Sequence, residues 1–446
     1  MASSKKLAPS ELDAYLQARL PALIAPGGRA TLALSGGVDS VVLLNLLLSA
    51  QRTLNFSLSA IHVNHHLSPH AKDWAAFCAA LCAEHGVPLT VKNVQVPRRS
   101  SLGLEAAARS LRYQAFAELD TDVLLLAHHL DDQAETLLLN LLRGAGVRGA
   151  AGMPASRHQA LLLARPLIDV PRAVLMAYAK QHRFAWVEDE SNDNTAFARN
   201  FLRHEVLPVV ERRFPAYRQT LARAAQHFSE ADALLDELAV IDLASALQGE
   251  KLRLAALMKL SHARAKNLFR AYLETQGVPL LDADRLREWL RQLLTARADS
   301  RVALGVAGLT LRRYRGEAWV EFDIPAPAPD WQMAWCGERE IKLPVLGGKL
   351  LFTTAQGAGI SLAKLMQFEV TLRLRHGGEK LKPSCTRPRK TLKHLLQEAA
   401  IPPWQRERLP LIYSGAHLVA VPDIGIDCVF HAAPGEPGLK ISWASN

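Results

Sequence analysis

One hexapeptide constrains the fold of this chain more than any other stretch, and it consists of Ser35, Gly36, Gly37, Val38, Asp39 and Ser40. The segment 29–34 before it is apolar enough for a buried strand, and the segment 41–48 after it is apolar on almost every face. A strand, a glycine turn and a buried helix in this order place several backbone N–H groups at a helix N-terminus, where the dipole favours an anion. The stretch therefore predicts a phosphate-binding loop.

The residue types in the hexapeptide suit a phosphate that is accompanied by a cation. Glycine lets the backbone approach a ligand closely, and the hydroxyls of Ser35 and Ser40 can donate to phosphate oxygens. A carboxylate beside a phosphate repels it unless a cation lies between them, so Asp39 implies Mg²⁺. The alternative is a serine and glycine turn that only caps a helix.

The hexapeptide lacks the lysine of the Walker pattern G-x-x-x-x-G-K-[ST], which occurs nowhere in the chain. It resembles instead the pyrophosphate-binding loop of the ATP pyrophosphatases, which split ATP between the α and β phosphates. Those families include asparagine, GMP and NAD synthetases and several tRNA-modifying enzymes. The resemblance implies that ATP is a substrate.

Length and charge bound the remaining possibilities. A chain of 446 residues is long enough for two or three domains, and its formal net charge of +10 favours an anionic partner. A large nucleic acid suits that charge better than a membrane does, and a generic basic surface is the alternative. The N-terminus lacks the apolar core of a signal peptide and no apolar run reaches membrane-spanning length, which predicts a cytoplasmic protein. The five cysteines contain no C-x-x-C, so neither a disulfide framework nor a zinc ribbon is expected.

Short apolar runs alternate with helix-like periodic segments up to about residue 143. We expect strands over 31–34, 57–64, 88–96 and 122–128, and helices over 38–50, 69–85, 103–119 and 131–143. This alternation predicts an α/β domain with a doubly wound parallel sheet. Ligands of such sheets bind beyond the C-terminal ends of the strands.

The first polar segment at that edge follows the second predicted strand and contains Asn64. Several nearby histidines suggest a metal cluster, but no carboxylate or cysteine keeps ligand spacing with them, so zinc is disfavoured. We expect the backbone of this segment and Asn64 to contact a nucleotide base.

The second segment places Glu105, Arg109 and Arg112 on one face of a predicted helix. The arginines can face phosphate, which suits their planar and permanently charged guanidinium groups. A solvated face of ion pairs is the alternative.

The third segment contains the acids Asp131, Asp132 and Glu135, which follow a strand and open a helix. Helix capping explains one of them, whereas three acids beside an ATP site suggest that they bind magnesium or hold an amino substrate.

Two further segments contain arginines beyond the predicted sheet edge. Arg143 and Arg148 belong to a formal G-x-G-x-x-G run, which follows a helix and is therefore read as a mobile loop that closes over the site rather than as a dinucleotide motif. Arg199 and Arg203 lie one helical turn apart with Asn200 between them, and they can bind phosphates or form surface ion pairs.

The order and spacing of these motifs resemble one family in particular. The hexapeptide, the segments 62–68, 104–113 and 127–136, and Glu-Asp-Glu-Ser-Asn at 188–192 before Arg-Asn-Phe-Leu-Arg at 199–203 together resemble the tRNA(Ile)-lysidine synthetase family. The resemblance covers nearly the whole chain and is weakest in its centre. It implies an adenine nucleotide α-hydrolase-like catalytic domain over 1–216, a mainly helical tRNA-binding domain over 217–360, and a small α+β tRNA-binding domain over 361–446.

The last of these domains has a basic helix start followed by a tryptophan. Arg387, Arg389, Lys390 and Lys393 are expected to bind the tRNA backbone, and Trp404 can clamp a base or simply pack.

The resemblance also implies a reaction. ATP adenylates the C2 carbonyl oxygen of the wobble cytidine in an isoleucine tRNA with a CAU anticodon, and the ε-amino group of lysine then attacks C2 and expels AMP. Residues 35–40 would bind pyrophosphate and Mg²⁺, with Asp39 as the metal ligand, while Arg109 and Arg112 would meet phosphates or the adenylated base. The three acids at 131, 132 and 135 would hold and deprotonate lysine, and Arg199 and Arg203 would bind tRNA.

Three other functions are compatible with parts of the pattern. A tRNA sulfur-transfer enzyme shares the ATP loop, but such chemistry usually needs a cysteine pair or an iron–sulfur cluster, for which the cysteine spacing is unsuitable. A small-molecule amide synthetase would leave the basic C-terminal segments unexplained, and a non-catalytic RNA-binding protein would leave the hexapeptide and the acids unexplained. The oligomeric state stays open, a homodimer included.

Overall fold

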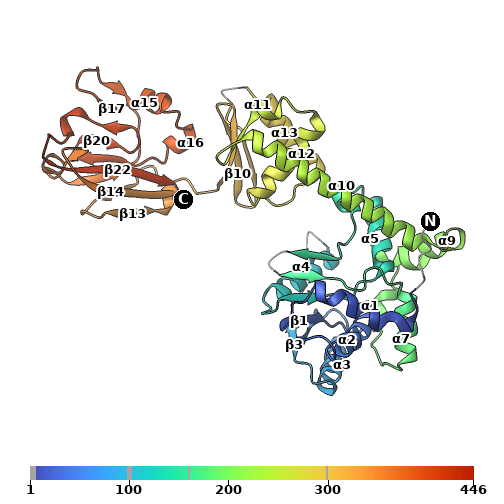
Figure 1. Cartoon of the computed structure of the whole chain (residues 1–446). Coiled ribbons are helices and arrows are strands. Elements are labelled where there is room, and N and C mark those ends of the chain that lie inside the picture. The colour runs from blue at the N-terminus through green and yellow to red at the C-terminus, as the bar shows by residue number, and fades with distance from the viewer. Residues whose placement is uncertain (1–6, 98–102, 159–160, 298–299, 446) are drawn as a thin grey trace. The chain divides into compact units, whose positions relative to one another are not determined.

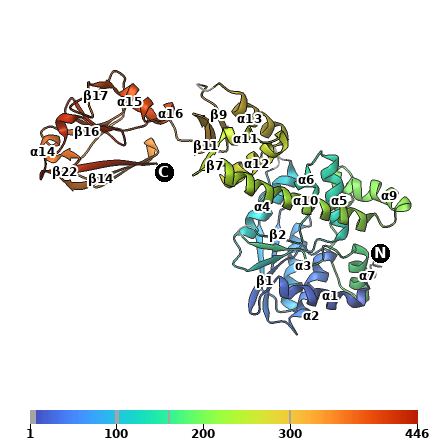
Figure 2. The same ribbon diagram turned by 45° about the horizontal axis from the view of Figure 1, so that its top comes forward.

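The structure is a computed structural model that describes residues 7–97, 103–158, 161–297 and 300–445. The chain forms two compact units, which divide between Glu237 and Leu238 (Figures 1 and 2). In the described part of the chain, no helix is long and apolar enough to cross a membrane.

A six-stranded sheet organises the first unit. Its strands follow the order β3 (Leu89–Asn93), β2 (Phe56–Asn64), β1 (Gly28–Ala33), β4 (Val123–Leu125), β6 (Leu162–Ala164) and β5 (Ser156–His158). All neighbouring strands are parallel except β5 and β6, which are antiparallel. The predicted doubly wound parallel sheet is confirmed.

The helices of the first unit follow the predicted alternation. They are α1 (Leu12–Arg19), α2 (Val38–Ala50), α3 (Ala71–Glu84), α4 (Leu104–Ala117), α5 (Leu130–Leu142), α6 (Val147–Ala150), α7 (Arg172–Gln181), α8 (Ala198–Phe201) and α9 (Leu207–Arg213). A π-helix over Leu202–Val206 joins α8 to α9, and α10 (Tyr217–Ala246) begins in this unit. The predicted helix over 38–50 coincides with α2, whereas β4 ends three residues earlier than the strand predicted over 122–128.

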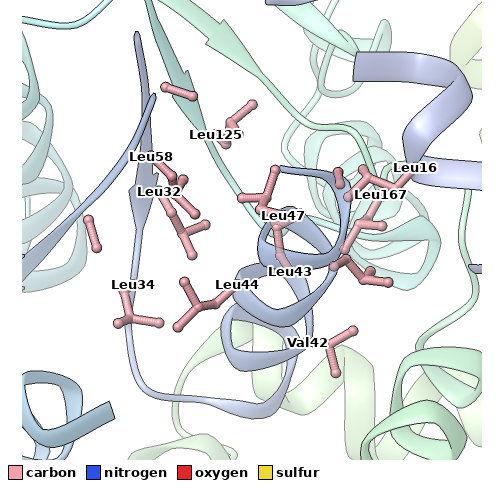
Figure 3. Packing of buried hydrophobic residues seen from close by; sticks show 14 of the residues in the cluster. Leu16, Leu32, Leu34, Val42, Leu43, Leu44, Leu47, Leu58, Leu125 and Leu167 are labelled. Atoms are coloured by element: carbon pink, nitrogen blue, oxygen red, sulfur yellow. The ribbon is translucent and has the colours of Figure 1, made fainter. Parts of the chain in front are cut away.

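Apolar side chains cover both faces of this sheet. On one face Leu32 and Leu58 pack with Leu43 and Leu47 of α2, as Figure 3 shows. On the other face Ile61, Leu124 and Leu163 pack with Phe116 of α4. Burial on both sides explains why the strands read as continuous apolar runs rather than as alternating ones.

The strand order reverses at β1, which places two helix N-termini side by side. From β1 the chain proceeds to β2 and β3 on one side, and then returns to β4 on the other side of β1. Helices α2 and α5 therefore begin at the carboxyl ends of two adjacent parallel strands. Ligands of open α/β sheets bind at this kind of switch point.

The second unit begins with a segment of three helices and a five-stranded antiparallel sheet. The helices are α11 (Leu254–Leu257), α12 (His262–Thr275) and α13 (Ala283–Thr295), and the strands follow the order β7 (Leu247–Gln248), β8 (Lys251–Arg253), β11 (Glu317–Phe322), β10 (Leu309–Tyr314) and β9 (Ala303–Val306). Helix α13 buries Leu286, Trp289, Leu290 and Leu293. That spacing is the apolar stripe of an amphipathic helix.

The C-terminal part of the second unit packs two antiparallel sheets against each other. The first contains β12 (Gln332–Ala334), β16 (Val370–Arg373), β19 (Leu411–Ser414), β20 (His417–Val421) and β21 (Gly425–Ile426), and the second contains β13 (Glu340–Leu343), β14 (Gly348–Gln356), β22 (Pro437–Ser445) and β15 (Ile360–Ser361). Their core includes Leu350 and Phe352 from one sheet and Leu372 and Ile412 from the other. A two-stranded ribbon and three short helices complete this part of the unit. The ribbon consists of β17 (Lys380–Leu381) and β18 (Lys390–Thr391), and the helices are α14 (Leu362–Leu365), α15 (Leu392–Glu398) and α16 (Pro403–Arg406).

Candidate active site

The hexapeptide forms the turn between β1 and α2. Gly36 has φ +88, and a Cβ at this position would lie 2.7 Å from Val187 Cγ2 and 3.1 Å from Cys78 Sγ. Glycine is therefore needed for both its conformation and its size. The backbone N–H of Val187 donates to Gly36 O at 3.0 Å, so the segment after α7 holds the loop in place.

The N-terminus of α2 is open to an anion. Among the described residues, no side chain caps this helix, whose N-cap residue is Gly37. The hydroxyls of Ser35 and Ser40 lie 3.1 Å apart beside it, and Ser40 Oγ donates to Gly37 O at 2.8 Å. Uncapped N–H groups with two hydroxyls match the donor set that phosphate oxygens need.

Asp39 lies in the first turn of α2 with one oxygen unsatisfied. Its Oδ1 atom is buried and accepts no hydrogen bond from the described residues, while Oδ2 lies 3.6 Å from His129 Nε2. An orphaned carboxylate oxygen at a phosphate cradle fits a Mg²⁺ ligand. The described residues contain no group of three or more His, Cys, Asp or Glu arranged for a metal ion, so a cation here would share its coordination with phosphate oxygens and water.

His129 couples the two helix N-termini. It is the N-cap of α5, where its Nδ1 accepts from the Asp132 N–H at 3.3 Å and its own N–H donates to Asp132 Oδ2 at 3.0 Å. Its Nε2 faces the carboxylates of Asp39 and Asp132, at 3.6 and 3.4 Å. Burial opposes a charge on this ring, but Asp132 and Asp39 outweigh burial and raise the pKa of His129.

The pKa of the adjacent His128 is shifted in the opposite direction. Arg165 Nε donates to His128 Nδ1 at 3.1 Å, and because a guanidinium can only donate, the ring proton of neutral His128 is on Nε2. Burial lowers the pKa of His128 to about 3, with Asp132 opposing and Arg165 adding to the effect. Arg165 is only 4% exposed and also donates to Pro154 O at 2.8 Å.

Asp132 and Glu135 form a buried network with Arg199 and Arg203. Arg199 donates from Nε to Glu135 Oε2 at 2.7 Å and from Nη2 to Asp132 Oδ1 at 2.8 Å. Arg203 donates to both oxygens of Glu135, at 2.7 and 2.9 Å. Glu135 is only 2% exposed. Arg199 and Arg203 therefore form ion pairs, which was the alternative to phosphate binding. These ion pairs lie inside the site rather than on the surface.

These contacts also set the ionisation of the network. Burial disfavours the charge on Asp132, yet His129 and Arg199 outweigh burial and lower the pKa of this carboxyl. Burial likewise disfavours the charge on Arg203, and hydrogen bonds to Glu135 outweigh it, so the pKa of Arg203 is raised.

Asp131 lies on the other side of the same helix start. Its Oδ2 accepts the backbone N–H of Arg172 at 2.8 Å, and its Oδ1 accepts a hydrogen bond from Arg218 Nε. Arg218 also pairs with Glu211. Arg165, Arg172 and Arg218 were not predicted as site residues, since none belongs to a motif.

The arginines of α4 approach the same edge. Arg109 donates to Tyr113 OH at 3.2 Å. Arg112 lies close enough to lower the pKa of His65, after the larger effect of burial, and it contributes in the same direction at His128. The side chain of Glu105 lies outside the described residues.

Two predicted asparagines make local contacts. Asn64 is buried, its side chain donates to Ala71 O and accepts from the His66 N–H, and its carbonyl accepts from the Val94 N–H at 2.9 Å, so these groups hold the end of β2 together. Asn200 donates to the carbonyls of Ser191 and Asn194.

In the glycine-rich run, Arg143 is exposed at the end of α5. Arg148 lies on α6 and donates to Asp232 and Asp236 of α10. The glycine run is thus partly helical, and the side chain of Asn140 donates to Gly149 O at 2.8 Å.

In the second unit the basic segment lies on the β17–β18 ribbon and α15. Arg389 donates to Asp427 and Lys390 to Glu398, while Arg387 and Lys393 are exposed. Trp404 packs against Trp319, with ring centroids 5.8 Å apart, and its Nε1 donates to Glu321 at 3.1 Å. In these contacts Trp404 packs within the protein, which was the alternative to clamping an RNA base.

Comparison with known proteins places this architecture in a family. Residues 12–210 match the PP-loop domain, residues 252–319 match the TilS substrate binding domain, and residues 370–443 match the TilS substrate C-terminal domain. The chain is 44% identical to the tRNA(Ile)-lysidine synthase of Nitrosomonas europaea, over 99% of this chain and 98% of that protein. It is 41% identical to the protein of the same name from Azoarcus sp. strain BH72, over 95% and 93% of the two chains. The chain therefore belongs to the tRNA(Ile)-lysidine synthase family.

Proposed function

We propose that this chain ligates lysine to C2 of the wobble cytidine of an isoleucine tRNA with a CAU anticodon, through an adenylated tRNA intermediate, releasing AMP and pyrophosphate. The observation that supports this most directly is the open N-terminus of α2 beside Asp39, whose buried Oδ1 has no hydrogen-bond partner among the described residues. Membership of a family whose relatives are named tRNA(Ile)-lysidine synthase supports the choice of substrate.

The phosphate loop activates the cytidine. ATP binds with its pyrophosphate at the N-terminus of α2, where N–H groups and the hydroxyls of Ser35 and Ser40 donate to phosphate oxygens. Asp39 would hold Mg²⁺, which supplies charge neutralisation for the pyrophosphate as it leaves. Arg109 and Arg112 meet phosphates or the adenylated base from α4.

The acids hold the lysine. Asp131, Asp132 and Glu135 already have fixed orientations, because arginines and helix N–H groups hold each carboxylate. A lysine ammonium with a pKa near 10.4 must lose a proton before it attacks C2, and a carboxylate in this group can accept that proton.

The tRNA is bound by both units. In the first unit Arg143, Arg148, Arg199, Asn200 and Arg203 are the proposed contacts, with Arg199 and Arg203 acting from within the acid network. In the second unit the proposed contacts are Arg387, Arg389, Lys390 and Lys393. We place the first domain boundary at 216/217. We move the second from the expected 360/361 to a position before β12, because β12, β13 and β14 share sheets and a core with the strands after residue 361. We place the protein in the cytoplasm. We further propose a homodimer, which light scattering on the purified protein would test.

A sulfur-transfer reaction is the less supported alternative. Cys78 and Cys82 are buried, and burial raises the pKa of the Cys78 thiol to about 12. A sulfur-transfer cysteine reacts as the thiolate, which this environment disfavours.

The first test is a nucleoside mass analysis of CAU isoleucine tRNA incubated with the protein, Mg·ATP and lysine. We expect a cytidine heavier by one condensed lysine, and no such product with the methionine tRNA of the same anticodon. Asp39→Asn should lower the rate by about 100-fold or more, since it removes charge at the phosphate site. Asp73→Asn is the control, because Asp73 is exposed on α3.

Two results would contradict these assignments. AMP release without a change in nucleoside mass would return the choice of acceptor to the other reactions of ATP pyrophosphatases. An unaltered rate for Asp39→Asn would remove Asp39 from the chemistry.

A further inference from the structure

Arg172 opens helix α7 at the edge of the phosphate site and belongs to none of the motifs. Its backbone N–H donates to Asp131 Oδ2 at 2.8 Å, and its guanidinium Nε lies 3.9 Å from Asp39 Oδ1. The side chain is 44% exposed. Arg172 therefore has a fixed backbone and an accessible guanidinium beside the carboxylate of the hexapeptide.

The guanidinium of Arg172 is uncommitted, unlike those of its neighbours. Within the described residues it donates no hydrogen bond, and its contact with Asp39 is at the limit of an ion pair. Four other arginines of this site are held by carboxylates, a histidine or a backbone carbonyl: Arg165, Arg199, Arg203 and Arg218. A purely structural arginine would not leave Asp39 Oδ1 without a hydrogen bond.

The segment before Arg172 is anchored to the switch point. The N–H of Leu130 donates to Val170 O at 2.9 Å, and Val170 N–H donates to Leu167 O at 2.9 Å. Together with the bond to Asp131, these contacts fix where α7 begins relative to α2 and α5. The backbone of Arg172 is therefore preorganised, and only its side chain has to be ordered when an anion arrives.

We propose that Arg172 binds the pyrophosphate portion of ATP, contacting the β and γ phosphates at the N-terminus of α2. This inference rests on the proposed function, and it adds a catalytic residue to it. As the C2 oxygen of cytidine bonds to the α phosphorus, the bond from that phosphorus to the bridging oxygen breaks and its electron pair leaves with pyrophosphate. Arg172 stabilises the charge that develops on this leaving group.

The proximity of Asp39 favours pyrophosphate over an RNA phosphate as the ligand. A carboxylate with an unsatisfied oxygen repels a backbone phosphate, whereas a nucleotide polyphosphate brings its own divalent cation to that oxygen. The planar guanidinium then completes the phosphate coordination with two parallel donors.

Isothermal titration calorimetry on the full chain tests this, with Mg·pyrophosphate, Mg·ATP and AMP as ligands. Arg172→Met should weaken pyrophosphate and ATP binding by about 10- to 100-fold, the loss expected for a charge-assisted hydrogen bond. AMP binding should be unchanged, and Arg172→Lys should lose less than Arg172→Met, because it retains the charge without the planar donors. Lys180→Met is the matched control, since it removes an exposed cation from the same helix.

Each other outcome has a definite meaning. Wild-type affinity for pyrophosphate in a folded Arg172→Met variant would overturn the inference, as would an equal loss for Lys180→Met. Weaker tRNA binding in a filter assay with unchanged pyrophosphate affinity would assign Arg172 to RNA instead. Failure of the wild-type protein to bind any of the three ligands would contradict the proposed ATP site itself.

Discussion

Two groups of basic residues in this molecule carry the same kind of charge in different surroundings. In the first unit Arg199 and Arg203 lie in a buried network with Asp132 and Glu135. In the second unit Arg387 and Lys393 are exposed, and neither forms an ion pair with another described residue. The difference teaches that arginines near a nucleotide site can shape the site itself, whereas exposed cations act on a polyanion from outside.

The largest expected effect comes from breaking the buried network. Glu135→Gln removes the charge that pairs with two arginines and leaves both of them to share Asp132. Breaking a buried ion pair on one side costs about 3–5 kcal/mol in the free energy of unfolding. Urea denaturation followed by hydrogen exchange at α5 measures that loss in the first unit. Glu118→Gln is the matched control, because Glu118 forms one exposed pair with Lys92 and should contribute at most about 1 kcal/mol. An equal loss of unfolding free energy in the two variants would show that the network stabilises the protein no more than an exposed ion pair does.

The next effect concerns pH and tests how well the site is shielded from solvent. The folded-state pKa of His128 is about 3, below the value near 6.5 expected when unfolded, so its contribution to stability is present above pH 6.5 and is lost as pH falls towards 3. His128→Asn keeps an acceptor for Arg165 and removes the titration. The stability difference between wild type and this variant should therefore shift by about 2 kcal/mol against the wild type between pH 7 and pH 5.

Thermal denaturation across that pH range measures the shift. His85→Asn is the control, because His85 is exposed. If the stability of the wild type and of His128→Asn changes with pH in parallel, His128 is solvated. The site in the first unit would then be less shielded from solvent than its contrast with the exposed group in the second unit requires.

The smallest effect is expected in the exposed group. Arg387→Gln with Lys393→Gln should weaken tRNA binding by about 10-fold and lower the slope of log affinity against log salt by about 1 to 2. Filter binding at several salt concentrations measures both quantities, and the melting temperature should stay unchanged. Lys342→Gln with Lys440→Gln is the control, since both lysines are exposed in the same part of the chain. An equal loss for the control would mean that net charge, rather than this segment, attracts the tRNA.

Local pattern was sufficient to predict four strands of the sheet and the glycine turn. The apolar strands, the helix over 38–50 and the glycine turn are properties of contiguous residues. Strands β5 and β6, the strand order that creates the switch point, and the proximity of Asp39 to the start of α5 were not predicted, because they depend on which distant segments pair.

The residues that the arginines of the site contact could not be predicted from local sequence pattern. Helical spacing places Arg199 and Arg203 on one face, but it does not reveal that Glu135 lies opposite that face. Arg165, Arg172 and Arg218 come from segments that reach the site only through the packing of β6, α7 and α10 around it. In the second unit, packing likewise decides that Trp404 lies against Trp319.

The segment between Val187 and Arg199 has a consequence for how such a protein can change during evolution. One end is bonded to Gly36 in the phosphate loop, and the other carries the arginine that holds Asp132 and Glu135. Most side chains between these ends are exposed, so the two anchored ends, rather than a packed core, fix the path of the segment. An insertion or deletion would pull one end out of register with its partner. The length of this stretch is therefore constrained at both ends, in addition to any constraint on its motif at 188–192.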